Sequence, residues 1–171
     1  MPVETPVLTE IDVRKPGYFK RQYGFWLGDK QVAAIEFKKG WSHKATFVTG
    51  DKKWDVRSCG FWSKRIELIA QQSPYTKLTL EYNWKYKINF KDSNGNWYLF
   101  KRTGVWKSCW NWIDEKGNPV MKLKSIHFSR KARGRISFFK PVTDEMYLLM
   151  LIGWFQLVNY EAQAAVAASA A

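Results

Sequence analysis

The chain has 171 residues, 46% of them hydrophobic and 17% aromatic, which is enough to build one domain with a full core. A formal net charge of +13 indicates an acidic partner, a lipid headgroup surface or a nucleic acid; the alternative is a well-solvated basic protein. The only cysteines, Cys59 and Cys109, lack CxxC spacing, which excludes a disulfide framework and a cysteine-based zinc site. We therefore expect a reduced, cytoplasmic protein, and the first residues show neither a secretory signal nor a myristoylation glycine.

Residues 1–16 are polar and contain three prolines, which predicts an extended N-terminal arm or an edge segment. After them, short runs of aromatic and β-branched residues alternate with turn signals about every eight to twelve positions, the spacing of an all-β protein. The expected strands are Tyr18–Leu27, Gln31–Lys38, Ser42–Val48, Lys53–Ser58, Phe61–Gln71, Thr76–Tyr82, Trp84–Lys91, Trp97–Arg102, Trp106–Ile113, Val120–Phe128 and Arg133–Phe139.

Apolar and polar residues alternate strictly from Leu78 to Lys91. Because successive side chains of a strand point to opposite faces, this pattern predicts one dry face and one wet face. A later strand repeats the pattern with tryptophan. We expect the aromatic side chains on the dry faces to fill the interior, at Trp84, Tyr86, Phe90, Trp106, Trp110 and Trp112.

A single helix is predicted over residues 144–160, capped by Thr143 and with Asp144 and Glu145 in its first turn. From residue 146 to residue 158 every face is apolar except at Gly153 and Gln156, and a helix of this kind is enclosed by protein or by lipid. A bilayer needs about 20 apolar residues, so about thirteen favour enclosure by protein, with insertion into lipid as the alternative. Gly153 is expected to let the surrounding wall approach closely. The Ala-rich tail, 161–171, is expected to extend the helix outside the domain.

Eleven strands followed by one all-apolar helix predict a mainly β fold, a closed antiparallel barrel of about 11–12 strands around a central C-terminal helix. Eight-stranded barrels are filled by their own side chains, whereas a helix is about 10–12 Å wide and needs a wider wall. The expected organisation is an arm (1–16), one barrel domain (17–160) with its central helix at 144–160, and a tail (161–171).

Pairs of basic residues recur at the expected strand ends, and no acidic residue lies between Glu115 and Asp144. Pairs at strand ends gather charge on the rims of a barrel, where each basic residue near an anionic membrane contributes about 1 kcal/mol. The alternative is a solvated surface, or lysines that protect strand edges. The candidate ligand-binding residues are Lys38, Lys39, Lys64, Arg65, Lys101, Arg102, Arg130, Lys131 and Arg133; two further pairs are Lys20-Arg21 and Lys52-Lys53.

An aromatic meander that ends in the helix beginning Asp144-Glu145-Met146-Tyr147-Leu148-Leu149, with basic-Gly-Trp turns such as Lys38-Lys39-Gly40-Trp41, resembles the tubby C-terminal-like superfamily. That superfamily includes the phospholipid scramblase-like and the LURP-one-related proteins, and the resemblance covers about residues 17–160. It implies a twelve-stranded barrel with a C-terminal hydrophobic helix as its core. It also implies non-enzymatic binding of anionic phospholipid headgroups such as phosphoinositides.

No catalytic constellation stands out. His43 and His127 have no cysteine or carboxylate at metal-ligand spacing, and phosphate-binding glycine loops are missing. We therefore expect no enzyme, no cofactor and no metal. The favoured function is docking of a cytoplasmic protein, peripherally, to an anionic membrane surface. The alternative is a barrel that binds single-stranded nucleic acid with basic and aromatic surface residues.

Overall fold

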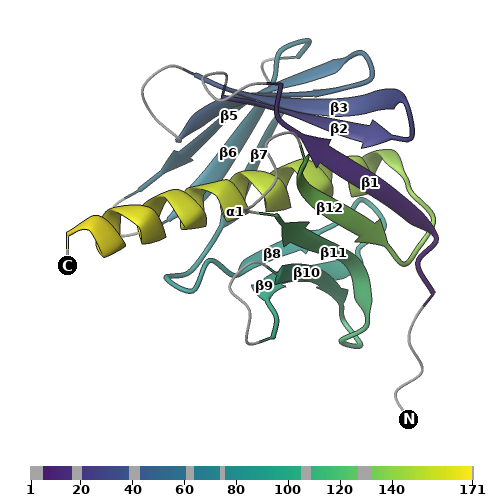
Figure 1. Ribbon diagram of the computed structural model, residues 1–171. Helices are drawn as coiled ribbons and strands as arrows, with labels where there is room; N and C mark the ends of the chain where they lie inside the picture. Colours follow the sequence, from purple (N-terminus) through teal and green to yellow (C-terminus); the bar gives the residue numbers. More distant parts are fainter. Residues whose placement is uncertain are drawn as a thin grey trace.

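The computed structural model describes residues 6–16, 21–38, 43–60, 64–73, 76–104, 109–126 and 132–170, with the backbone alone at residue 132. It contains one antiparallel sheet and one helix, α1 (Asp144–Ser169) (Figure 1). The strands are β1 (Thr9–Arg14), β2 (Gln22–Leu27), β3 (Lys30–Phe37), β4 (Lys44–Thr49), β5 (Lys52–Cys59), β6 (Arg65–Ala70), β7 (Lys77–Glu81), β8 (Ile88–Lys91), β9 (Trp97–Arg102), β10 (Cys109–Asp114), β11 (Pro119–Ser125) and β12 (Ala132–Phe138).

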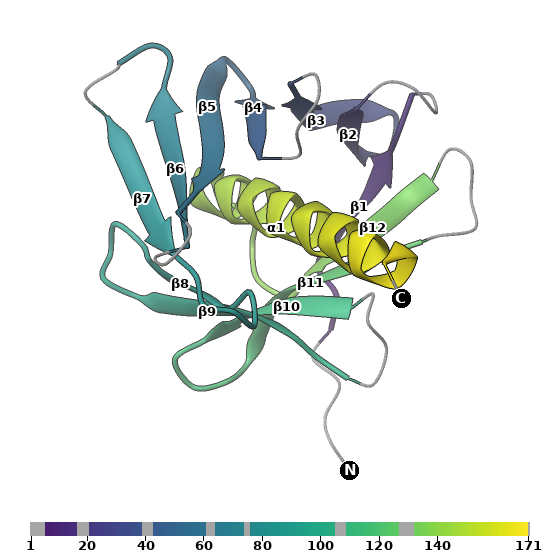
Figure 2. The same ribbon diagram turned by 90° about the vertical axis from the view of Figure 1, so that its left-hand side faces the viewer.

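The sheet curls into a nearly closed barrel with α1 running through it (Figures 1 and 2). Its strand order is β7-β6-β5-β4-β3-β2-β1-β12-β11-β10-β9-β8, so the first and last strands of the chain lie side by side in the middle of the order. The two edge strands, β7 and β8, meet at an isolated bridge between Tyr82 and Ile88. The expected mainly β barrel of 11–12 antiparallel strands around a C-terminal helix is confirmed.

The N-terminal segment differs from the prediction. Residues 9–14 were expected to lie in an extended arm or an edge segment, yet β1 is hydrogen-bonded to β12 on one side and to β2 on the other. Ile11 and Val13 point inward and are fully buried. A six-residue strand with only two apolar inward side chains gives a weak alternation signal, and the flanking prolines obscured it.

The alternation from Leu78 to Lys91 is interrupted by a turn. The amide groups of Lys85 and Lys87 donate to Asn83 Oδ1 at 2.9 and 3.1 Å, which is a side-chain turn typical of asparagine. Trp84 therefore lies outside either strand and is 74% exposed, so its predicted burial is wrong. The other aromatic residues among those predictions that the structure describes, Tyr86, Phe90, Trp110 and Trp112, are buried as expected; Trp106 lies outside the described residues.

Helix α1 provides the centre of the core. Thr143 Oγ1 accepts a hydrogen bond from the Met146 amide at 3.3 Å, as the capping signal predicted. Residues 149–157 are all buried, and so the wall covers every face of this stretch. A Cβ on Gly153 would lie 2.9 Å from Trp112 Nε1 and 3.1 Å from Phe100, which confirms the expected close approach. Gln156 is fully buried too, and its amide nitrogen and oxygen have no hydrogen-bond partner in the described structure.

The helix continues to Ser169, so the expected extension of the tail is confirmed, and residues 163–170 are exposed. No helix in the part of the chain that the structure describes is both long enough and apolar enough to cross a membrane.

Candidate functional site

The barrel has two ends, defined by the direction of α1. At the start rim, where α1 begins, Lys52 Nζ lies 3.4 Å from Asp144 Oδ2, and the Ser93 amide donates to Glu145 at 3.1 Å. At the exit rim, where α1 leaves, Arg102 Nη1 donates to the Tyr160 hydroxyl at 2.6 Å. The registers of the paired strands place every strand end at one rim or the other.

The described candidate residues all lie at or next to the exit rim. They come from the ends of strands that arrive there and the starts of strands that leave it, on both halves of the barrel. Lys52 and Lys53 lie at the start rim instead. The candidates brought to the exit rim are Lys38, Lys64, Arg65, Lys101, Arg102 and Arg133, whereas Lys39, Arg130 and Lys131 lie outside the described residues.

Further basic residues that were not among the candidates share this rim. The acidic residues described at the same end are Glu36, Glu81 and Glu161. Three further carboxylates, Asp12, Asp55 and Glu67, pair with the rim cations Arg14, Lys38 and Arg65. The rim therefore carries an excess of positive charge. The additional basic residues are Arg14, Lys15, Arg21, Lys44, Lys85 and Lys87.

Three cations crowd together where β1, β2 and β12 meet at the exit rim: Lys15, Arg21 and Arg133, here called the cation cluster. Burial lowers the pKa of Lys15, and the charges of Arg133 and Arg21 lower it further. Lys15 Nζ lies 5.9 Å from the centre of the Tyr23 ring, and Arg133 Nε is buried without a hydrogen-bond partner in the described structure. Like charges held together in this way favour an anion, because a bound anion relieves their repulsion.

A second group of cations stands over aromatic rings at the end of α1. The Arg102 guanidinium lies 5.6 Å from the centre of the Tyr160 ring, and Lys64 Nζ lies 5.4 Å from that of Tyr86. The Tyr86 hydroxyl in turn hydrogen-bonds Gln163 of α1. Burial raises the pKa of Tyr86, so its hydroxyl stays protonated at neutral pH. These contacts fix the two basic side chains against the helix.

Two candidates are already engaged by carboxylates. Lys38 Nζ lies 3.5 Å from Asp55 Oδ1. Arg65 donates to Glu67 at 3.2 Å, and Glu67 also binds Arg57 at 2.6 Å and Lys77 at 3.1 Å. Glu67 is only 4% exposed, so three cations surround one nearly buried carboxylate on the outer face of β5–β7. Lys38 and Arg65 are thus less available to a ligand than the cation cluster.

The ionic contacts of Glu67 predict an acid-sensitive stability. Hydrogen bonds from Arg57 and Lys77 lower the pKa of Glu67 from 4.5 to about 2. A lowered folded-state pKa stabilises the protein above the unfolded-state value, and this contribution is lost as the pH falls from about 4.5 to about 2. Thermal unfolding of Glu67→Gln, followed by circular dichroism, should show a lower melting temperature at pH 7 and a smaller drop across this window. Arg57→Gln should share the effect; a Glu67→Gln protein with the wild-type pH dependence would contradict it.

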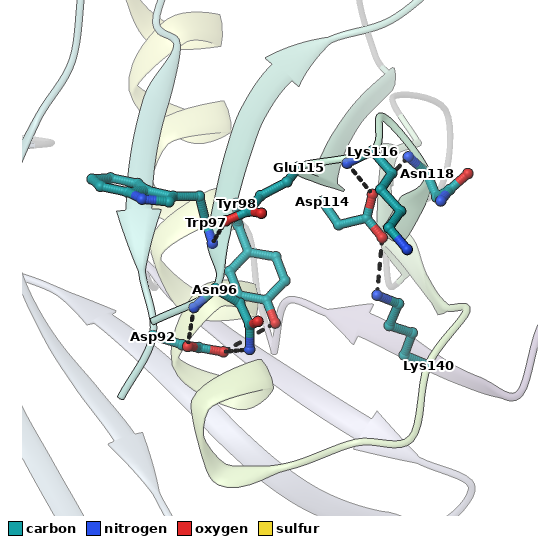
Figure 3. Close-up of polar contacts among 9 residues, drawn as sticks. All are labelled: Asp92, Asn96, Trp97, Tyr98, Asp114, Glu115, Lys116, Asn118 and Lys140. Carbon is teal, nitrogen blue, oxygen red and sulfur yellow. Dashed lines mark hydrogen bonds and ion pairs between the residues drawn. The ribbon is translucent and has the colours of Figure 1, made fainter. Parts of the chain in front are cut away.

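At the start rim, Asp92 and Asp114 accept hydrogen bonds from backbone amides of the turns that follow them (Figure 3). Asp92 accepts from the Asn96 amide at 2.8 Å and from the Tyr98 hydroxyl at 3.1 Å. Burial alone would raise the pKa of Asp92, but these hydrogen bonds outweigh it and lower the value. Asp114 accepts from Lys140 Nζ at 3.0 Å and from the amides that follow it. Positive charge at this rim is therefore balanced locally.

Surface hollows exist at both ends. One of ≈ 550 Å³ lies at the start rim between α1 and β3–β5, and its lining mixes Lys30 and Lys52 with Asp51, Asp144 and Glu145. Another of ≈ 500 Å³ opens beside the cation cluster, over Tyr23 and Trp26. Of these two hollows, only the one beside the cation cluster adjoins an excess of positive charge. The described residues contain no group of three or more His, Cys, Asp or Glu that could hold a metal ion. The absence of enzymatic activity stays a prediction.

Sequence reasoning overlooked part of this site. Lys15 stands alone before Pro16, in a segment expected to be an arm, and Arg21 was noted only as half of a pair. The sequence signal available was the basic character of the connection between β1 and β2. The adjacency to Arg133 depends on the pairing of β1 with β12, which joins residues more than a hundred positions apart.

The molecule is thus a nearly closed twelve-stranded antiparallel barrel with a C-terminal helix, an architecture consistent with that of the tubby-like proteins. No protein-family model matches the chain, and neither a curated protein nor a solved structure is significantly similar to it.

Proposed function

We propose that this protein docks on anionic phospholipid headgroups through its exit rim, performs no chemistry there, and is a distant relative of the tubby-like proteins. The observation that carries the proposal is the segregation of charge: the described candidate residues gather at one end, while the other end also carries carboxylates, of which Asp114 pairs with Lys140 and Asp144 with Lys52. Each basic residue near an anionic membrane contributes about 1 kcal/mol, so a rim with several of them is sufficient for reversible docking.

The cation cluster is the centre of this proposed surface. Lys15, Arg21 and Arg133 sit close enough together that their charges oppose one another in the unbound protein. Phosphate groups of lipid headgroups would relieve that repulsion and accept hydrogen bonds from the two guanidinium groups. Arg102 and Lys64, on the other half of the rim, would contact the same plane of headgroups.

Vesicle co-sedimentation tests the proposal. The chain should bind phosphatidylcholine vesicles that contain about 30 mol % phosphatidylserine, should ignore pure phosphatidylcholine, and should be released as salt rises from about 0.1 to about 1 M. A second set of vesicles contains a phosphoinositide at the same total charge. Binding that is tighter to these vesicles would show recognition of the headgroup, whereas equal binding would show general electrostatic attraction. Equal binding to neutral and to anionic vesicles would overturn the proposal.

Nucleic acid remains the alternative anionic partner, and the same experiment addresses it. Single-stranded nucleic-acid sites combine positive grooves with accessible aromatic rings. Among the described residues the two exposed tryptophans, Trp84 and Trp97, lie at opposite rims, so they do not form one stacking surface. An oligonucleotide that displaces the protein from anionic vesicles at stoichiometric concentration would favour this alternative.

A further inference from the structure

Two exposed apolar side chains stand out at the exit rim. Trp84, at the tip of the turn between β7 and β8, is 74% exposed, and Val166, on the last turns of α1, is 68% exposed. The other large apolar side chains exposed in the described structure lie towards the start rim, at Val7, Leu8, Leu27 and Trp97. The basic rim thus carries its own pair of apolar projections.

These projections are attached to one another. The turn that carries Trp84 is held by Asn83, and its last part is fixed by Tyr86, whose ring is buried and packs 5.2 Å from that of Tyr160. The Tyr86 hydroxyl hydrogen-bonds Gln163, just before the exposed end of α1. Lys85 Nζ lies 4.7 Å from the centre of the Trp84 ring. The turn that carries Trp84 is therefore attached to α1 through Tyr86.

The side chains of α1 beyond Gln163 are uncharged as well as exposed. Residues 164–170 are five alanines, one valine and one serine, and they rise about 10 Å beyond Gln163. Figure 1 shows this end of α1 projecting past the strands. A headgroup layer accepts such a projection, because apolar and aromatic groups of peripheral proteins penetrate about 5–10 Å into that layer.

We propose that Trp84 and the end of α1 form a non-ionic anchor that enters the headgroup layer of an anionic bilayer, so that the barrel docks end-on with α1 along the membrane normal. This inference rests on the proposed docking through the exit rim. The surrounding cations draw the rim to the surface, and the anchor then contacts the lipid between the headgroups. Trp is the residue favoured at this depth, since its ring is apolar and its N–H stays near water.

The structure provides a matched pair of variants. Trp97 is 47% exposed at the start rim and also has a lysine over its ring, Lys91, at 5.5 Å. Binding to phosphatidylcholine vesicles with about 30 mol % phosphatidylserine should weaken about tenfold in Trp84→Ala and stay unchanged in Trp97→Ala. The loss in Trp84→Ala should persist as salt is raised, because apolar contact is not screened. Val166→Asp, which puts a charge on an exposed helix position, should weaken binding to a similar degree.

The outcomes separate the two proposals. Wild-type binding to anionic vesicles combined with unaltered binding of Trp84→Ala and Val166→Asp would overturn the anchor and leave docking through the rim intact. Equal losses in Trp84→Ala and Trp97→Ala would overturn the end-on orientation. A wild-type protein that ignores anionic vesicles would overturn both proposals, and binding to a single-stranded oligonucleotide in their place would assign the rim to nucleic acid.

Discussion

Replacing Lys15, Arg21 and Arg133 together with glutamine is expected to weaken binding to anionic vesicles about a hundredfold. Each cation near the membrane contributes about 1 kcal/mol, and about 3 kcal/mol corresponds to slightly more than two powers of ten in affinity. The charges of Arg133 and Arg21 act on Lys15 in the unbound protein, so a bound anion would relieve their repulsion. Co-sedimentation with vesicles containing phosphatidylserine gives the measurement.

The matching control replaces Lys30, Lys53 and Lys116 at the start rim with glutamine, which removes the same net charge. If long-range attraction by the whole protein governed binding, the two triple variants would lose affinity equally. We expect the control to lose little. Melting temperatures test whether both variants remain folded. The variant that lacks Lys15, Arg21 and Arg133 should be at least as stable as the wild type, because the repulsion among these three cations is removed. Equal losses in the two variants would refute a rim-specific site.

Gly134→Ala is expected to lower the free energy of unfolding by about 3 kcal/mol. Gly134 lies in β12 between Val13 of β1 and Ser125 of β11, and it is buried. A Cβ there would overlap the ring of Trp154 and the Lys124 carbonyl oxygen. Without that overlap, alanine would stabilise a strand by about 0.5–1 kcal/mol relative to glycine. A decrease in the free energy of unfolding would therefore show that the Cβ overlaps its neighbours.

Urea unfolding followed by tryptophan fluorescence measures this change. Gly153→Ala is the control: its Cβ would lie 2.9–3.1 Å from side-chain atoms only, and alanine improves helix propensity by about 1 kcal/mol. It should therefore destabilise the protein less than Gly134→Ala, although the buried rings of Trp112 and Phe100 must shift to admit the methyl group. A Gly134→Ala protein as stable as the wild type would show that Trp154 does not press α1 against β12 as the structure has it.

The helix and most strands could be predicted from sequence because their signals are local. Thr143, the acidic first turn and the unbroken apolar run are contained in one segment, and they identified both the helix and its enclosure. The errors occurred where a local contact competed with the pattern. Asn83 bends the chain through its own side chain, which turned Trp84 outward although the alternation around it is regular.

The presence of a basic rim could be predicted from the sequence, but the residues that form it could not. Basic pairs at strand ends indicated charged rims, and in an antiparallel meander every second connection returns to the same end. Which residues meet there depends on β1 lying between β2 and β12, a pairing with no local signal. Lys15 was missed for that reason. Arg65 was named as a ligand-binding candidate although its guanidinium already forms an ion pair with Glu67.

The position of α1 after all twelve strands also constrains the order of events during synthesis. The ribosome releases all twelve strands before the residues around which they close, and β1 must wait for β12 before its second edge is paired. Until α1 emerges, the inward aromatic side chains of the strands have no helix to pack against. Domains with such distant pairings fold slowly, so the inner faces of the strands are expected to stay uncovered until α1 has emerged.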